Sequence, residues 1–156
     1  MKWIKIFMLY CLMIPLFFGC AMLEDPIVAS LGKYTDSEYY ITDGFQEYTI
    51  YARYVYPSAD LSENLWLEKI QETDLPVIYA HLDNYEGWIE TIGQSEPDSE
   101  VVIHYDFDWS AIDTEDYFYL ESEEHTWENG HTVLVNYDLY IFDTQTQTLY
   151  FFHNNI

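Results

Sequence analysis

From His131 to Asp143, apolar and polar side chains alternate along most of the stretch. One side of it would carry Val133, Val135, Tyr137, Leu139 and Ile141. Asn136 and Asp138 fall on the opposite side. Successive side chains of a strand point to opposite faces of a sheet, so this alternation is typical of an antiparallel strand with one buried face. We therefore predict a strand over 131–143.

Other segments carry related strand signals. Residues 101–107 place valine, isoleucine, tyrosine and phenylalanine at every second position, which predicts another half-buried strand. Aromatic and β-branched residues predict further strands over 49–56, 85–92, 117–124 and 148–153. Asn129 and Gly130 form the strongest hairpin-turn signal in the chain. This turn would join 117–124 to 131–143.

One helix is expected between the strands predicted over 49–56 and 85–92. Asp60 can cap it, Glu63 follows three residues later, and Pro76 would end it. Its buried stripe would consist of Trp66, Leu67 and Ile70. The order of elements predicts an α+β fold, an antiparallel β-meander of about five to six strands with one helix packed on a face.

The N-terminus has the layout of a secretion signal. Lys2 and Lys5 precede an apolar run over 6–18 that contains no charged residue. The run leads into Phe17–Cys20, which resembles the lipobox of bacterial lipoproteins. The resemblance covers only the first twenty or so residues. It implies that 1–19 are removed and that Cys20 becomes the acylated first residue of the mature chain.

Two other interpretations of this segment remain open. Residues 6–23 just reach the roughly 18 residues that a membrane-spanning helix needs, so the segment can be an uncleaved anchor. Ordinary cleavage after Ala21 would instead release a soluble protein. These three interpretations export the body of the chain, and a fourth leaves it in the cytoplasm. The lipobox places the body at the extracytoplasmic face of a bacterial membrane, bound through its N-terminal lipid.

The body of the chain contains no cysteine, because Cys11 and Cys20 both lie in the leader. No disulfide can therefore stabilise it, and packing must do so. The remaining length suits one domain with a modest core. We expect a tether over 20–42 and a single domain over 43–156 that folds alone.

The chain is strongly acidic, with a formal net charge of −23. After the leader, the only basic residues are Lys33, Arg53 and Lys69. Such a surface repels nucleic-acid phosphates and anionic lipid head groups, so the charge argues against nucleic-acid binding and against flat docking on a membrane. Cations and basic peptides are the favoured ligands.

Aromatic residues are unusually abundant, with 16 tyrosines, 9 phenylalanines and 5 tryptophans. Tyr137 and Tyr140 must face opposite ways on one strand. The sheet therefore either has both faces covered or shows tyrosines to solvent. Exposed tyrosines on an acidic sheet can bind sugar rings or a partner strand.

The common enzyme signatures are missing from the sequence. It contains no Gly-x-Ser-x-Gly elbow, no His-Glu-x-x-His motif and no phosphate-binding glycine loop, and its body has no thiol nucleophile. We therefore predict that the chain is not an enzyme.

Metal binding is a more specific hypothesis than catalysis, because candidate ligands can be named. The candidate calcium ligands are Asp106, Asp108, Asp113, Glu115 and Asp116. They begin like a calcium loop, but Ala111 and Tyr117 replace its glycine and its bidentate glutamate, which leaves a looser oxygen-ligand site for Ca²⁺. His125 and His131 are disfavoured as zinc ligands, because the predicted hairpin pairs His125 with Leu134 and keeps the two histidines about 10 Å apart.

These observations lead to an expectation about function. The chain is expected to be a membrane-anchored, exported acidic lipoprotein that acts as a non-catalytic binding module for a protein, peptide or sugar ligand. The alternative is an immunity or inhibitor protein that captures a basic toxin or enzyme outside the cell.

Overall fold

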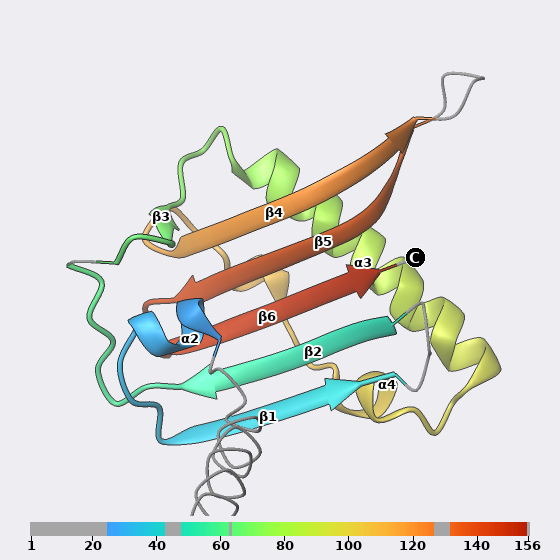
Figure 1. Cartoon of the computed structure of the whole chain (residues 1–156), viewed down its shortest axis with the longest axis horizontal. Helices are drawn as coiled ribbons and strands as arrows, with labels where there is room; N and C mark the ends of the chain where they lie inside the picture. The colour runs from blue at the N-terminus through green and yellow to red at the C-terminus, as the bar shows by residue number, and fades with distance from the viewer. Residues whose placement is uncertain (1–24, 43–47, 63, 127–131, 156) are drawn as a thin grey trace, which may run out of the picture.

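The computed structural model describes residues 25–42, 48–62, 64–126 and 132–155 (Figure 1). Their strands are β1 (Asp36–Ile41), β2 (Tyr48–Val55), β3 (Glu68–Lys69), β4 (Tyr117–Thr126), β5 (Thr132–Asp143) and β6 (Thr148–Asn155). Their helices are α2 (Pro26–Ser30), α3 (Leu75–Ser95), α4 (Glu100–His104) and the short 3-10 helix η1 (Trp109–Ala111).

The strands form one six-stranded sheet in the order β1-β2-β6-β5-β4-β3, in which every neighbouring pair is antiparallel. The predicted antiparallel sheet of about five to six strands is thus confirmed, as is its combination with helix. β4, β5 and β6 follow one another as a meander, and the β1–β2 hairpin joins it through β6. The last strand therefore lies inside the sheet (Figure 1).

Four predicted strands are confirmed, because 49–56, 117–124, 131–143 and 148–153 correspond to β2, β4, β5 and β6. The predicted Asn129-Gly130 turn lies outside the described residues, but the β4–β5 pairing that it would join is present. A register shift between Glu123 and Glu124 pairs His125 with Val133. The predicted partner, Leu134, was therefore wrong by one residue, because the sequence does not reveal a bulge.

The helix predicted between Asp60 and Pro76 is wrong. Asp60 accepts hydrogen bonds from the backbone N–H and the hydroxyl of Ser62, a local turn, and residues 68–69 form β3. Pro76 lies in the first turn of α3. A proline at that position removes a backbone N–H that has no partner within the helix, so it favours a helix start rather than a helix end.

The strands predicted over 85–92 and 101–107 are also wrong, because these residues belong to α3 and to α4 with the chain that follows it. On α3 the buried residues Ile78, Leu82, Tyr85 and Ile89 recur at helical spacing. In α4 the alternation fails, since Val101 is fully buried whereas Ile103 is 60% exposed.

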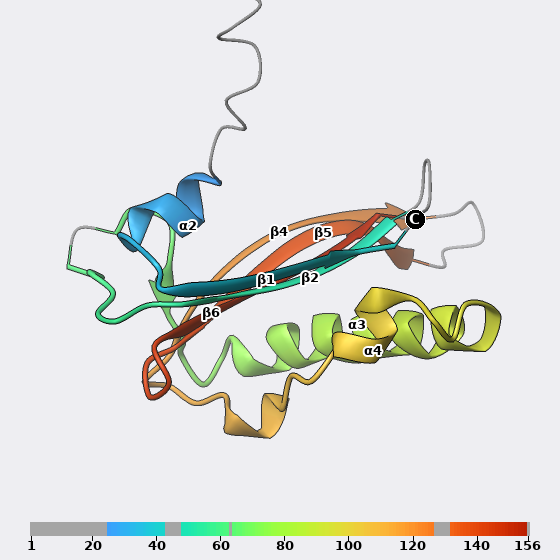
Figure 2. The same cartoon turned by 90° about the horizontal axis from the view of Figure 1, so that it is seen from below.

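The sheet separates two apolar clusters on its two sides. The cross-strand neighbours Tyr51, Phe152, Leu139 and Leu120 face α3, and we call this side the helix face. The next row, Ala52, Phe151, Tyr140 and Tyr119, points to the other side, which we call the open face. Figure 2 shows α3 and α4 beneath the sheet and α2 above one end of it.

Most of the segment expected to be a tether belongs to the folded domain. Asp25 caps α2 by accepting hydrogen bonds from the backbone N–H groups of Ile27 at 2.8 Å and Val28 at 3.3 Å. Both residues and Leu31 are buried in the open-face cluster, and β1 pairs along β2. The domain therefore begins before residue 43.

The predicted leader, including Cys20, lies outside the described residues. Within the described residues, no helix combines the length and the apolar character needed to cross a membrane.

Candidate functional site

The five carboxylates predicted as calcium ligands have protein partners of their own. Asp106 accepts hydrogen bonds from the Tyr51 hydroxyl at 2.7 Å and from Arg53 Nη1 at 3.2 Å. Asp108 accepts from the backbone N–H and the hydroxyl of Ser110 at the start of η1, and these bonds lower the pKa of Asp108. Both carboxylates thus position the chain between α4 and β4.

The other three predicted ligands shape the turn before β4. Asp113 accepts from the backbone N–H of Glu115, and Glu115 pairs with Lys69 Nζ at 3.0 Å. Asp116 is only 2% exposed, and it accepts hydrogen bonds from the backbone N–H groups of Asp113 and Thr144. Burial raises the pKa of Asp116 above its ordinary value.

The five residues are not gathered around one point. Asp106, Asp108 and Asp116 line a hollow of about 200 Å³, together with Asp143 from the end of β5, which sequence reasoning did not single out. Asp113 and Glu115 do not line it. Within the described residues, no group of three or more His, Cys, Asp or Glu side chains is arranged to hold a metal ion. Calcium binding stays a prediction.

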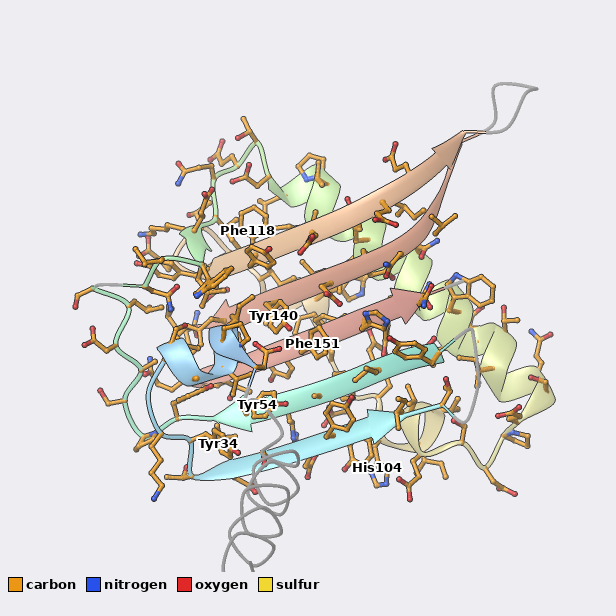
Figure 3. The ribbon with its side chains drawn as sticks, in the orientation of Figure 1. Tyr34, Tyr54, His104, Phe118, Tyr140 and Phe151 are labelled. Carbon is orange, nitrogen blue, oxygen red and sulfur yellow. The ribbon has the colours of Figure 1, made fainter. Side chains whose placement is uncertain are left out.

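A second feature crosses the open face of the sheet. Six rings from the loop before β3 and from β4, β5, β6 and β2 follow one another as Trp66, Tyr119, Tyr140, Phe151, His153 and Tyr48. We call them the aromatic row. Tyr140 and Phe151 stack with ring centroids 4.4 Å apart, and Figure 3 shows them on neighbouring strands beside α2. His153 and Tyr48 stack at 4.7 Å.

Three polar atoms of this row contact carboxylates, whereas His153 Nε2 is buried without a hydrogen-bond partner among the described residues. The Tyr119 hydroxyl donates to Glu121 at 3.2 Å, and the Tyr140 hydroxyl donates to Asp25. His153 Nδ1 lies 2.6 Å from a carboxylate oxygen of Asp138. Burial, followed by the neighbouring carboxylate, raises the pKa of both tyrosines. The row therefore combines ring faces with negative charge.

The two ends of the row are accessible and its middle is covered. Trp66 is 40% exposed at one end, whereas Tyr140 and Phe151 are buried. At the other end, Tyr39 and Ile41 of β1 extend the apolar surface, with 52% and 45% of their area exposed. The open face therefore presents an exposed ring beside Tyr119 and Glu121 at one end and exposed apolar side chains of β1 near the other.

Sequence reasoning anticipated exposed tyrosines on an acidic sheet but did not find this row. Its six rings come from five segments, and their proximity follows from the strand order and register. Tyr119, Tyr140 and Phe151 are direct cross-strand neighbours, which a correct pairing of β4, β5 and β6 would have predicted. The contact of Trp66 with Tyr119 depends on the pairing of β3 with β4. The sequence did not predict this pairing, because a helix was predicted over the same residues.

Two tyrosines on the helix face have backbone partners. Tyr85 and Tyr137 are buried and donate to the backbone carbonyl groups of Ile50 and His81. Burial is the main cause of the raised pKa of both phenols. These side chains stabilise the contact between α3 and the sheet and have no surface to offer a ligand.

Comparison of the chain with protein-family models, with curated proteins and with solved structures finds no match.

Proposed function

We propose that this protein is a non-catalytic binding module at the outer face of a bacterial membrane, anchored through a lipid on Cys20, and that the open face of its sheet binds a cationic ligand. The aromatic row with its carboxylates carries this proposal. Ring faces attract ammonium and guanidinium groups, and the attraction strengthens where water is partly excluded.

The charge of the whole chain supports the same ligand class. A net charge of −23 attracts basic partners over distances well beyond contact and accelerates their association at low ionic strength. Arg53 and Lys69 pair with Glu38, Asp106 and Glu115, none of which contacts the row, whereas His153 of the row pairs with Asp138. Among the described residues, Glu121 beside the row has no basic partner and can meet a cationic ligand.

A second candidate function uses the same face. An immunity or inhibitor protein would capture one basic toxin or enzyme outside the cell, and the strong acidity of the chain favours this role as well. The two candidates differ in the affinity and selectivity of the partner and not in the surface that binds it.

The binding surface is tested with the full chain in detergent micelles and a fluorescent octa-arginine peptide. Trp66→Ala combined with Tyr119→Ala leaves the net charge unchanged and should weaken binding about three- to tenfold, because two cation–π contacts are lost. Trp109→Ala is the matched control, since this half-buried tryptophan contacts Tyr79 on the helix-face side. Equal affinities of the double variant and the wild type would contradict the proposal.

The anchor is tested by Cys20→Ser with palmitate labelling and membrane fractionation. The wild type should take up label and fractionate with membranes, and the variant should remain unlabelled because it lacks the thiol that accepts the lipid. An unlabelled wild type that stays in the membrane at full length would favour the uncleaved anchor instead.

A further inference from the structure

The two edges of the sheet are closed to different degrees. β1 forms one edge, and α4 lies beside it, where His104 stacks on Tyr40 with ring centroids 4.3 Å apart. At the other edge, the ten-residue strand β4 is paired with β3 only at Tyr117 and Phe118. Beyond Phe118, no described strand continues the ladder on that side of β4.

A hydrogen bond between the backbone N–H of Trp66 and the side chain of Asn64 explains why β3 is so short. Ile70 donates its backbone N–H to the carbonyl group of Asp116, so every second residue from 116 onward directs its backbone groups toward β3. The next partners in this register would be Trp66 and Leu120. However, Trp66 donates its N–H to the Asn64 side chain at 2.8 Å and so is not available to the ladder.

Backbone groups of Leu120 and Ser122 therefore point outward from the sheet. The register shift between Glu123 and Glu124 limits this open ladder to the segment 119–123, which we call the β4 edge. An unpaired edge of this kind can accept an extended segment of another chain through main-chain hydrogen bonds.

The side chains along the β4 edge define the occupant. Glu121 and Glu123 are exposed and project on the open face, and no described basic side chain pairs with either. Leu120 and Ser122 project toward the helix face. Between the two glutamates and Asp138 of β5 lies a hollow of about 130 Å³ lined mainly by polar surface.

We propose that the β4 edge binds one extended segment of a basic partner, with lysine or arginine at every second position and small apolar residues between them. The basic side chains lie beside Glu121 and Glu123, and the apolar ones extend the surface of Leu120. The partner then reaches the exposed Trp66 end of the aromatic row. This inference depends on the proposed function only in taking the partner to be basic.

A second copy of this chain fits the edge poorly. Its own exposed strand edges carry acidic residues, and two chains with a net charge of −23 repel each other. Glutamates on an edge can also serve only to prevent pairing with other chains. That role predicts that no strand adds to β4 under any condition.

The test uses the full chain in detergent micelles with the peptide Lys-Val-Lys-Val-Lys-Val-Lys, blocked at both ends. The control peptides have the same sequence, with the backbone nitrogens of either the lysines or the valines methylated, so that one edge of each cannot donate. The unmodified peptide should slow hydrogen exchange of the Leu120 and Ser122 amides at least tenfold. Blocking the edge that faces β4 should weaken binding at least tenfold at unchanged charge.

The matched variants are Ser122→Pro and Ser37→Pro. Proline is tolerated on an edge strand where its N–H would face outward, so both variants should keep the fold, as checked by far-UV circular dichroism. Ser122→Pro should bind the peptide at least tenfold more weakly, and Ser37→Pro on β1 should bind it like the wild type. If Ser122→Pro unfolds, the exchange data and the methylated peptides decide the question alone.

The outcomes separate this inference from the proposed function. Equal binding of all the peptides, protection of β1 amides instead of β4 amides, or pairing of β4 with a second copy would overturn the β4 edge as a peptide site. In those cases, octa-arginine binding that depends on Trp66 and Tyr119 would leave the proposed function standing. If neither peptide binds the wild type, both proposals fail.

Discussion

The two faces of this sheet are built from the same strands but are covered very differently. One 21-residue helix, α3, lies along the helix face, and its buried residues Ile78, Leu82, Tyr85 and Ile89 pack against the strands. On the open face, α2 has only five residues and covers one end. The helix-face core and the candidate binding surface therefore lie on opposite sides of one sheet.

Four tyrosine hydroxyls illustrate contacts on the two faces. On the helix face, Tyr85 and Tyr137 donate to backbone carbonyl groups, which fixes α3 on the sheet. On the open face, Tyr119 and Tyr140 donate to carboxylates of Glu121 and Asp25. The type of acceptor does not follow the face, because Tyr51 on the helix face donates to Asp106 and Tyr56 in the open-face cluster donates to the carbonyl group of Val28. What differs is exposure, since Tyr85 is fully buried whereas Glu121 is exposed.

The largest expected effect comes from removing the cover of the open face. A chain that begins at residue 43 lacks α2 and β1 and exposes Ile50, Ala52 and Leu149, which are buried in the intact domain. We expect a loss of more than about 5 kcal/mol, which is comparable with the whole stability of a small domain. Its thermal melt should be noncooperative, while a chain that begins at residue 25 should melt cooperatively.

This deletion also tests the boundary that the sequence suggested. A cooperative melt of the chain that begins at residue 43, followed by far-UV and near-UV circular dichroism, would show that the open face needs no cover. The two faces would then differ less than the structure implies.

The next effect compares one leucine from each covering layer. Leu82 of α3 and Leu31 after α2 are both fully buried. Leu82→Ala should cost about 3–5 kcal/mol and Leu31→Ala about 2–3 kcal/mol, because a short helix can collapse into the cavity more easily than a long one. Urea unfolding measures both values, and a larger loss for Leu31→Ala would reverse the ranking of the layers.

A smaller effect is expected from removing single hydroxyl groups. Tyr85→Phe leaves the buried carbonyl group of Ile50 without this donor and should cost about 1–3 kcal/mol. Tyr140→Phe should cost only about 1 kcal/mol, because Asp25 keeps its bonds to the N–H groups of α2. Urea unfolding at pH 7 provides the comparison, and equal losses would mean that the two acceptors are equally shielded from water.

The smallest expected effect is that of calcium. A Ca²⁺ ion bound by Asp106 and Asp108 must compete with Tyr51, Arg53 and Ser110 for the same oxygens. We therefore expect calcium to raise Tm by no more than about 3 °C beyond sodium chloride at matched ionic strength. Asp106→Asn with Asp108→Asn should abolish this increment, and an increment that survives in the variant places the ion elsewhere.

The sequence predicted the C-terminal half of the fold better than the middle. From Tyr137 to Ile141 the predicted apolar side of β5 is the buried helix-face side, and β4 and β6 are rich in aromatic and β-branched residues, so local pattern and tertiary environment agree there. In the middle, residues 85–92 were predicted as a strand because aromatic residues and Gly87 resemble a broken strand. Tyr85 and Ile89 continue the helical spacing of the buried residues Ile78 and Leu82, and longer-range packing decided the outcome.

The sequence predicted the kinds of residue in the candidate site but not which residues come together. Composition indicated an acidic surface with exposed aromatic rings, and the structure has both on the open face. The pairing of Tyr119 with Glu121 is local, two residues apart on one strand, but Tyr140 and Asp25 are separated by most of the chain. No local pattern can bring such residues together.

The sequence alone determined the net charge, the cysteine-free body and the strand character of β2, β4, β5 and β6, because these depend on residue type and on spacing within a few residues. Tertiary structure decided that 101–107 is not a strand, that α2 and β1 belong to the domain, and that β4 beyond Phe118 has no partner strand on its outer side among the described residues. The physical reason is that burial and pairing depend on neighbours distant in sequence. Asn64, for example, ends β3 by binding the N–H of Trp66, and through that one contact it leaves Leu120 open to a partner.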